Sequence, residues 1–518
     1  MAKIVTVKEM VQIEKAANAA GHTYAQMLEQ AGKSVADALL SKIPELSGKH
    51  ILVLAGTGNN GGDGLVAARW LAEAGAAVVV YLTKKRPAED PHLTALKEIG
   101  LLIANAEEDQ RNRVLDLQLG RADIVIDAVL GTGFKLPLKG TAKEALRAVR
   151  RSTARPFVVA VDCPSGLDCD TGQVAEETLQ ADLTVTLAAA KPGLFQFPGA
   201  GRVGELVFGD IGLSPSQTEL TSIDREVATP ETMRALLPSR PPDAHKGTFG
   251  RALIVAGSIN YPGAAALAGR AAYLAGAGLV TIAAPTPVQA MIAGDIPECT
   301  WIPLGDALEA SDVDRLAGEW ANVEGLLLGP GLGLEPSTAE FVEGLFTLPD
   351  AKSNLPPVVV DADALKLMAD IEGWHALLPE GSVLTPHPGE MSDLTGNKTQ
   401  EIQSNRHSVA IDKASEWGSV LILKGAFTLI AHPGGRSVLI PIATSALATA
   451  GTGDVLAGLL VGYRAQGIEA YEAAELASYV HARAGVLAAK AVGTAASVLA
   501  GDVAAAIPGA IAELEQAR

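Results

Sequence analysis

The chain has 518 residues, of which 48% are hydrophobic and 19% are charged, and its formal net charge is −18. That length allows roughly two to four domains with full hydrophobic cores. A strongly negative chain lacks the positive surface that non-specific binding to nucleic acid or to an anionic membrane needs. We therefore expect neither partner.

The cysteines and the start of the chain indicate the compartment. Cys163, Cys169 and Cys299 cannot all pair within one chain, and their spacing matches no metal-binding pattern. Charged residues run through the first 15 positions, so no apolar core of a secretory signal can form there. No uninterrupted apolar run reaches the length of about 18 residues that a membrane span needs. The sequence thus predicts a soluble, cytoplasmic protein.

Short apolar runs alternate with amphipathic stretches in the first half of the chain. The runs have strand length and are rich in β-branched residues. They are residues 51–55, 78–82, 124–126, 157–161 and 183–187. Helical patterns such as 65–74 separate them. This alternation predicts an α/β fold with a parallel sheet covered on both faces, in which ligands bind beyond the carboxyl ends of the strands.

A glycine-rich loop follows the first of these strands. Residues 56–64 read GTGNNGGDG and precede a helix, so backbone N–H groups can approach a ligand closely at the positive end of that helix. The spacing contains GxGxxG. A dinucleotide fingerprint also requires an acidic residue at the end of the second strand, and this chain has none there. A tight turn is the alternative. The side-chain oxygens of Asn60 and Asp63 favour a binding site instead.

Two other strands end in aspartate, at Asp127 and Asp162. Parallel strands place both carboxylates at the rim that holds the glycine loop. A lone aspartate at a strand end is more often a helix N-cap, but two beside a glycine loop indicate a site. Asn60, Asp127 and Ser165 would offer hard oxygen ligands to a cation, and Asp162 could act as a general base. The sequence alone does not separate those roles.

The segments NNGGDG, DAVLGTG and DCPSGLD, in that order, resemble the NAD(P)HX epimerase domain, which is Rossmann-like, over about residues 5–220. The resemblance implies that Asn60, Asp127 and Ser165 hold K⁺. It also implies that Asp162, with Lys135, moves the proton that lets the hydrated carbon invert. The residues implied in contact with the hydrated nucleotide are Asn59, Asn60, Gly61, Gly62, Asp63, Gly131, Thr132, Gly133, Phe134, Lys135, Leu136, Pro137 and Asp162.

A boundary between two domains is predicted where the periodicity fails. Residues 214–242 show no clear period and end in a proline-rich stretch that breaks regular structure. We place the domains at 1–225 and 226–518. The second half repeats the alternating pattern, and its strand-length runs are residues 252–256, 279–283, 326–328, 358–360, 383–384 and 420–423. An alanine-rich helix is predicted from Thr494 onward, with a break at Pro508-Gly509.

A phosphoryl-transfer site is predicted in the second half, although the chain has no Walker motif and so is not a P-loop enzyme. Residues 450–458, AGTGDVLAG, open an apolar helix. Gly451 and Gly453 free backbone N–H groups to face an anion. Asp454 would then accept a proton from a hydroxyl that attacks a phosphate. The alternative is that Asp454 is an N-cap, but the flanking glycines in a second α/β domain favour the base.

Three segments upstream fit the same site. Residues 424–428, KGAFT, follow a strand and could wrap a nucleotide. His387 is held between two prolines at another strand end, which favours substrate contact, although a lone histidine is more often structural. Asp361 and Asp363 end a third strand and could equally cap the next helix.

AGTGDVLAG is similar to the ribokinase-like superfamily. Together with TPHPGE, LKGAFT, GPGLG and VVDADAL, it resembles the ADP- or ATP-dependent NAD(P)HX dehydratase over about residues 240–505. The resemblance implies phosphorylation of the hydrate hydroxyl with ADP as co-substrate and Mg²⁺ on the phosphates, then elimination of phosphate. The implied nucleotide-binding residues are Lys424, Gly425, Ala426, Phe427, Thr428 and Gly453. The implied hydrate-binding residues are Ala264, Gly331, His387 and Asp454, with Asp454 as the base.

The two halves together predict one function, the repair of hydrated NADH and NADPH by epimerisation and nucleotide-dependent dehydration. The resemblance also implies a homo-oligomer. One alternative is a small-molecule kinase of the ribokinase-like type, but such a kinase needs no NNGGDG domain. A non-catalytic nucleotide-binding scaffold is the other, and it would need no base at Asp162 or Asp454.

Overall fold

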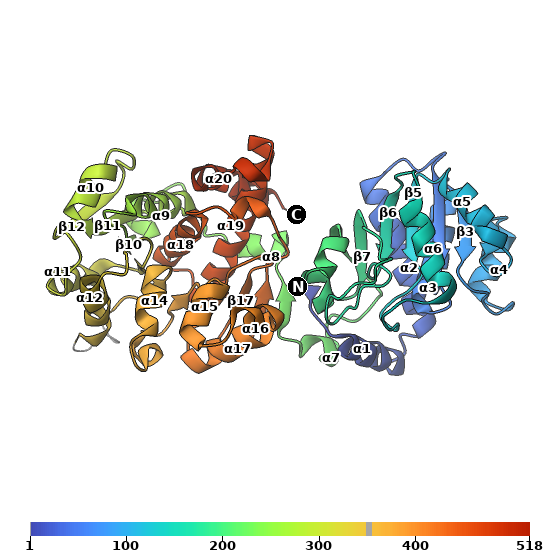
Figure 1. Ribbon diagram of the computed structural model, residues 1–518, viewed down its shortest axis with the longest axis horizontal. Coiled ribbons are helices and arrows are strands. Elements are labelled where there is room, and N and C mark those ends of the chain that lie inside the picture. The colour runs from blue at the N-terminus through green and yellow to red at the C-terminus, as the bar shows by residue number, and fades with distance from the viewer. Residues whose placement is uncertain (1, 349–354, 518) are drawn as a thin grey trace. The chain divides into compact units, whose positions relative to one another are not determined.

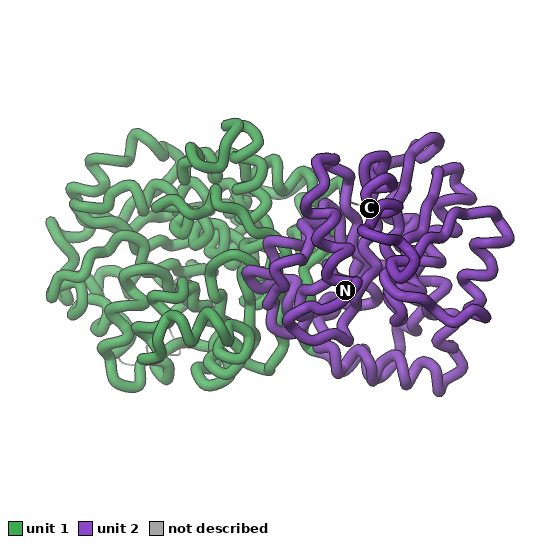
Figure 2. Tube along the Cα trace, turned by 45° about the vertical axis from the view of Figure 1, so that its right-hand side comes forward, with its two compact units in different colours: residues 1, 224–518 green, residues 2–223 purple. Residues whose placement is uncertain are grey.

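A computed structural model describes residues 2–348 and 355–517 of the chain. The chain folds into two compact units, residues 2–223 and the residues from Asp224 onward (Figure 2). Each unit has its own sheet with helices on both sides (Figure 1). The predicted α/β class is therefore confirmed in both halves of the chain.

The first unit is built on a seven-stranded sheet in the order β4-β3-β2-β5-β6-β7-β8, with every neighbouring pair parallel. Its strands are β2 (His50–Ala55), β3 (Ala77–Leu82), β4 (Leu102–Asn105), β5 (Ile124–Ala128), β6 (Phe157–Val161), β7 (Leu183–Leu187) and β8 (Glu205–Gly209). The order runs outward in opposite directions from β2 and β5. The carboxyl ends of these two strands therefore flank a topological switch point, where doubly wound sheets bind ligands.

Helices cover both faces of this sheet. The helices of this unit are α1 (Val7–Ala19), α2 (Tyr24–Lys42), α3 (Asn59–Glu73), α4 (Pro91–Glu98), α5 (Arg113–Leu119), α6 (Gly140–Arg151) and α7 (Thr218–Thr221), and the short strand β1 (Ala2–Lys3) precedes α1. Alternate residues of β2 belong to different cores. Ile51 and Val53 pack with α2 and α3, whereas Leu52 and Leu54 pack with α5 and α6. The predicted Rossmann-like sheet, buried on both faces, is confirmed.

The second unit has the strand order β9-β18-β17-β16-β15-β14-β13-β10-β11-β12. Its strands are β9 (Arg225–Val227), β10 (Arg251–Val255), β11 (Leu279–Pro285), β12 (Thr300–Leu304), β13 (Gly325–Leu328), β14 (Val358–Val360), β15 (Val383–Leu384), β16 (Val420–Leu423), β17 (Leu429–Ala431) and β18 (Ser437–Leu439). The strands from β16 to β12 are parallel, and β17 pairs antiparallel with both β16 and β18.

Two hydrophobic cores lie on the two faces of the second sheet, one against α9, α18, α19 and α20 and the other against α11, α12, α14 and α17. The helices are α8 (Pro230–Ala235), α9 (Pro262–Ala275), α10 (Thr286–Ile292), α11 (Asp312–Ala317), α12 (Pro336–Thr347), α14 (Asp363–Ala369), α15 (Pro388–Thr395), α16 (Thr399–Ser404), α17 (Arg406–Trp417), α18 (Thr452–Ala465), α19 (Ala470–Val492) and α20 (Ala500–Gln516). α18 packs closely on α9, since a Cβ on Gly458 would meet the Ala268 carbonyl oxygen at 2.3 Å. This close approach leaves no room for a side chain at position 458.

The predicted break at Pro508-Gly509 is wrong, because α20 continues through Pro508. Proline removes one helical hydrogen bond. Ile507, Ala510 and Leu514 are nevertheless buried on both sides of it, so burial holds the helix together. Among the described residues, no helix is long and apolar enough to cross a membrane.

Candidate active sites

The glycine-rich segment after β2 is largely helical. We expected a loop over residues 56–64, but α3 begins at Asn59. The glycines allow close packing instead: a Cβ on Gly61 would lie 2.1 Å from the Gly56 carbonyl oxygen, and one on Gly64 would lie 2.4 Å from the Ala128 Cβ. The amino end of α3 is thereby pressed against the end of β5.

Arg86 holds the turn between β2 and α3. Its Nη1 donates to the carbonyl oxygens of Gly56 at 2.7 Å and Gly58 at 3.1 Å, and its Nε donates to Asp90 Oδ2 at 2.7 Å. Sequence reasoning missed Arg86, because an isolated arginine beyond a strand belongs to no motif.

Oxygen atoms converge beside the start of α3. Ser165 Oγ donates to Asp127 Oδ1 at 2.5 Å, and Asn60 Nδ2 donates to the Leu130 carbonyl oxygen at 3.1 Å. Asn60 Oδ1 is buried and has no hydrogen-bond partner among the described residues. Asp127 is fully buried, and burial raises its pKa although hydrogen bonds from Ser165 oppose the shift. The three predicted cation ligands are therefore brought together.

The carboxylate of Asp162 is held by a buried lysine. Lys191 is 1% exposed, and its Nζ donates to Asp162 Oδ1 and to the Leu187 carbonyl oxygen at 3.2 Å. The Leu187 N–H donates to the same Asp162 oxygen at 3.0 Å. Burial opposes the charge of Lys191, but Asp162 raises the lysine's pKa overall. Asp162 has a φ of 64°, so its backbone is strained at the residue whose carboxylate binds Lys191 and the Leu187 N–H.

The charge of Asp162 acts electrostatically on two further carboxyl groups. Burial raises the pKa of Asp63 well above its ordinary value, and Asp162 and Glu14 add to the shift. Burial likewise raises the pKa of Glu14, although Lys191 opposes this. Sequence reasoning missed Glu14 and Lys191, which lie on α1 and after β7 in segments without a recognisable motif.

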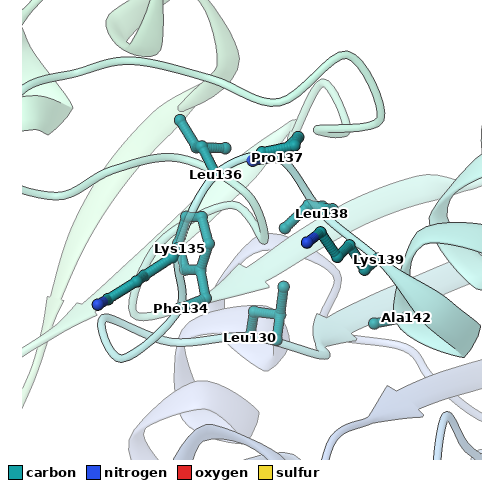
Figure 3. A pocket seen from close by; sticks show the side chains of 8 residues that line it. All are labelled: Leu130, Phe134, Lys135, Leu136, Pro137, Leu138, Lys139 and Ala142. Carbon is teal, nitrogen blue, oxygen red and sulfur yellow. The ribbon is translucent and has the colours of Figure 1, made fainter.

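Residues 134–137 of the predicted substrate segment 131–137 border a cavity of about 450 Å³ (Figure 3). The cavity is lined by Leu130, Phe134, Lys135, Leu136, Pro137, Leu138, Lys139 and Ala142. The side chain of Lys135 is exposed and extends away from Lys139 in this view (Figure 3). The cation paired with Asp162 is Lys191 rather than Lys135.

In the second unit, Asp454 is the third residue of α18 and does not cap it. The N-cap is Gly451, which has a φ of 88°. A Cβ on Gly453 would lie 3.7 Å from Lys424 Nζ, so the first turn of α18 faces this lysine. Burial and the negative charge of Asp361 raise the pKa of Asp454 to about 7, although Lys424 lowers it. Asp454 is thus poised to exchange a proton near neutral pH.

Lys424 is itself bound by carboxylates. Its Nζ lies 2.7 Å from Asp361 Oδ1 and 3.5 Å from Glu390 Oε2. Thr385 Oγ1 donates to the same Asp361 oxygen at 2.6 Å. Burial opposes the charge of Lys424, but Asp361 and Glu390 raise its pKa overall. Asp361 does not cap α14, and Asp363 accepts from the Gly333 N–H at 3.0 Å.

His387 caps α15. Its Nδ1 accepts from the N–H groups of Gly389 at 3.0 Å and Glu390 at 3.1 Å, and its Nε2 lies 3.3 Å from Glu390 Oε1. Half of the side chain is exposed. The side chain therefore caps α15 while half of it remains exposed.

The remaining predicted residues lie on loops of the same unit. Residues 424–428 connect β16 to β17, and Arg406 Nη2 supports this turn by donating to the Leu423 carbonyl oxygen at 2.8 Å. Sequence reasoning missed Arg406. Gly331 has a φ of 64°, and a Cβ there would lie 2.8 Å from the Ala264 Cβ, so these two predicted residues are neighbours.

Comparisons with known proteins cover both units. The family model described as YjeF-related protein N-terminus matches residues 24–193, and the model described as NAD(P)H-hydrate dehydratase matches residues 252–509. A Moorella thermoacetica protein named bifunctional NAD(P)H-hydrate repair enzyme is 38% identical over 530 residues, which cover 99% of this chain and 97% of that protein. A Thermofilum pendens protein of the same name is 35% identical over 506 residues, covering 94% and 92%.

A solved structure is similar to part of this chain. The Bacillus subtilis ADP/ATP-dependent NAD(P)H-hydrate dehydratase, co-crystallised with ATP and Mg²⁺, is 32% identical. The match covers 56% of this chain and 99% of that chain, with a TM-score of 0.49.

Proposed function

Because the chain belongs to the family of bifunctional NAD(P)H-hydrate repair enzymes, we propose that residues 1–225 epimerise hydrated NADH or NADPH and that the ribokinase-like residues 226–518 dehydrate it. The observation that carries this division is that each unit has an aspartate beside a lysine that is paired with a carboxylate, fully buried for Lys191 and half-buried for Lys424. Asp162 pairs with Lys191, and Asp454 faces the Lys424–Asp361 pair. Each aspartate can accept a proton from a hydroxyl of the substrate.

In the first unit, the hydrate binds at the switch point between β2 and β5. The amino end of α3 offers backbone N–H groups to the phosphates of the nucleotide. Asp162 acts as the base, and its bond to Lys191 holds the carboxylate in place. The residues we assign to substrate contact are Asn59, Asn60, Gly61, Gly62, Asp63, Gly131, Thr132, Gly133, Phe134, Lys135, Leu136, Pro137 and Asp162.

K⁺ fits the oxygen cluster beside this site. The unpartnered Asn60 Oδ1, the buried Asp127 carboxylate and Ser165 Oγ supply the hard oxygen ligands that such a cation prefers. Asp127 receives its hydrogen bonds from neutral groups, so a cation would offset its buried charge. The bound ion would order the turn after β5, which carries residues 131–137 toward the substrate.

In the second unit, Asp454 accepts the proton of the hydrate hydroxyl as that oxygen attacks the terminal phosphate of the nucleotide. Loss of the phosphate from the hydrated carbon, together with a proton from the adjacent ring carbon, then restores the dihydronicotinamide. The amino end of α18 offers backbone N–H groups to the transferred phosphate. We assign hydrate contact to Ala264, Gly331, His387 and Asp454. We assign nucleotide contact to Lys424, Gly425, Ala426, Phe427, Thr428 and Gly453.

We propose ADP as the nucleotide, with Mg²⁺ on its phosphates, where the ion would neutralise charge during transfer. The kinase alternative accounts for the second unit alone. It gives no role to the Asp162–Lys191 pair and the buried carboxyl groups of the first unit.

One assay tests both activities. The full chain is incubated with a mixture of hydrate epimers, ADP, Mg²⁺ and K⁺, and regenerated NADH is followed by absorbance. The wild type should convert both epimers to NADH. Asp162→Asn should convert only the S epimer to NADH, and Asp454→Asn should form no NADH from either. Asp454→Asn should still interconvert the epimers, which controls for loss of folding. Full dehydration by Asp454→Asn would overturn the proposal for the second unit.

A further inference from the structure

Contacts on two sides hold the turn between β2 and α3. On the side of β5, a Cβ on Gly56 would lie 2.0 Å from the Val129 carbonyl oxygen, so the turn packs directly on the chain that follows β5. On the side of β3, the Thr83 N–H donates to the Ala55 carbonyl oxygen at 2.9 Å. The ends of β2 and β3 therefore stay together, and the chain after β3 places Arg86 against the turn.

Arg86 uses two of its nitrogen atoms for two different contacts. Nη1 donates to the carbonyl oxygens of Gly56 at 2.7 Å and Gly58 at 3.1 Å, and Nε donates to Asp90 Oδ2 at 2.7 Å. The side chains of Arg86 and Asp90 are 10% and 7% exposed. Asp90 is itself fixed, because it is the N-cap of α4 and accepts from two N–H groups of that helix. The guanidinium is therefore anchored on one side and binds the turn on the other.

The two bound carbonyl groups set the direction of two N–H groups. The carbonyl and the N–H of a trans peptide point in opposite directions. The Gly56 carbonyl shares its peptide unit with the Thr57 N–H, and the Gly58 carbonyl shares its unit with the Asn59 N–H. Arg86 therefore turns both N–H groups away from itself. Within the described part of the chain neither N–H donates a hydrogen bond, and both residues are exposed, so the two groups are open to a ligand.

We propose that Arg86 is a positioning residue of the epimerase, which orients the turn so that the N–H groups of Thr57 and Asn59 bind the diphosphate of the hydrated nucleotide. Successive N–H groups in a turn form an anion-binding concavity, and the amino end of α3 adds its positive potential there. The proposal rests on the epimerase function proposed above. It assigns the diphosphate to one turn and the geometry of that turn to one side chain.

The role needs an arginine and not only a positive charge. A guanidinium presents several N–H groups in a rigid fork, whereas a lysine has a single nitrogen on a flexible chain. A lysine at position 86 can keep the ion pair with Asp90, but it cannot place a second nitrogen on the carbonyl groups of the turn. The turn would then sample other orientations, and the substrate would have to order it on binding, which lowers affinity.

The test measures conversion of the R to the S epimer of hydrated NADH by the full chain without ADP, so that the second unit is inactive. In Arg86→Lys we expect KM to rise about tenfold or more, in line with the loss of a hydrogen bond to a charged group, and kcat to stay unchanged. Asp90→Asn can still cap α4 and should raise KM by a smaller factor. Arg69→Gln, which breaks an ion pair with Glu29 on the same helix α3, is the matched control and should behave as wild type.

Inorganic pyrophosphate is the probe for the turn alone. It should inhibit epimerisation by the wild type in competition with the hydrate, and its inhibition constant should rise in Arg86→Lys by about the same factor as KM. The proposal is overturned if pyrophosphate does not compete in the wild type, if Arg86→Lys keeps the wild-type KM, or if Arg86→Lys lowers kcat with KM unchanged, as a misplaced base would. A wild-type chain that does not interconvert the epimers would instead overturn the epimerase function itself.

Discussion

Lys424 Nζ and Asp361 Oδ1 lie 2.7 Å apart and join the carboxyl ends of β16 and β14. The side chain of Asp361 is 2% exposed, and it is bound by this contact and by the hydrogen bond from Thr385. Lys424 also lowers the pKa of Asp454, against the larger effects of burial and of Asp361. One lysine thus stabilises a buried carboxylate and limits how far the pKa of the neighbouring Asp454 rises.

Lys424→Met should both destabilise the second unit and shift its pH dependence. Removing one partner of a buried ion pair costs about 3–5 kcal/mol, because the other charge is left without compensation. Without the ammonium, the pKa of Asp454 should rise further, so dehydration should need a higher pH. Thr385→Val is the control: it removes a hydrogen bond to Asp361 but no charge, and should cost about 1 kcal/mol without moving the pH profile. Denaturant unfolding and rates against pH measure the two effects. An unchanged profile in Lys424→Met would contradict the electrostatic role.

The rate of dehydration should follow the ionisation of Asp454. The pKa of this carboxyl is about 7, and a general base works only when it is deprotonated. At saturating S hydrate and ADP, kcat should therefore rise with pH up to about 7 and level off above it. The rate of NADH formation between pH 5.5 and 9 measures this. A profile that stays flat down to pH 5.5 would show that Asp454 is not the base.

In the first sheet, the interior strands could be predicted from the sequence, but the two edge strands could not. β2, β5 and β6 are buried on both faces and appear as continuous apolar runs. β4 and β8 lie at the two edges of the first sheet and are partly exposed, so their residues form no such run. The amino end of α3 was missed for another reason: its glycines suggested a loop, whereas they serve close packing.

The candidate sites were predictable only where a residue follows a strand. Asp127 and Asp162 could be named because parallel strands bring their ends to one rim. Lys191 could not be named, because its contact with Asp162 spans 29 positions and no motif surrounds it. Pairing across such a separation depends on how the loops fold over the sheet, and the local pattern does not contain that information.

Epimerisation should depend on K⁺ through Ser165. Ser165→Ala removes a proposed ligand of the cation and the hydrogen bond to Asp127 Oδ1, but leaves the backbone N–H of residue 165 bonded to Asp127 Oδ2. We expect the K⁺ concentration for half-maximal epimerisation to rise at least about tenfold, in line with the loss of one contact to a charged group. Ser34→Ala, whose hydroxyl bonds the Asp210 carbonyl oxygen away from this cluster, should leave the K⁺ dependence unchanged. If both variants needed the same K⁺ concentration for half-maximal epimerisation, the proposed K⁺ site at Ser165 would be wrong.

Substitutions of His387 should separate its capping of α15 from its proposed contact with the hydrate. Its Nδ1 caps α15, so His387→Ala should lose about 1 kcal/mol of stability, whereas His387→Asn can replace the cap with its side-chain oxygen. The exposed ring is proposed to contact the hydrate, and asparagine is too short to reach as far. We therefore expect His387→Asn to unfold like the wild type in denaturant but to show a raised KM for the hydrate and an unchanged KM for ADP. If stability and hydrate KM were both restored in His387→Asn, the ring would serve the helix alone, and the hydrate contact would have to be assigned to other side chains near Ala264 and Gly331.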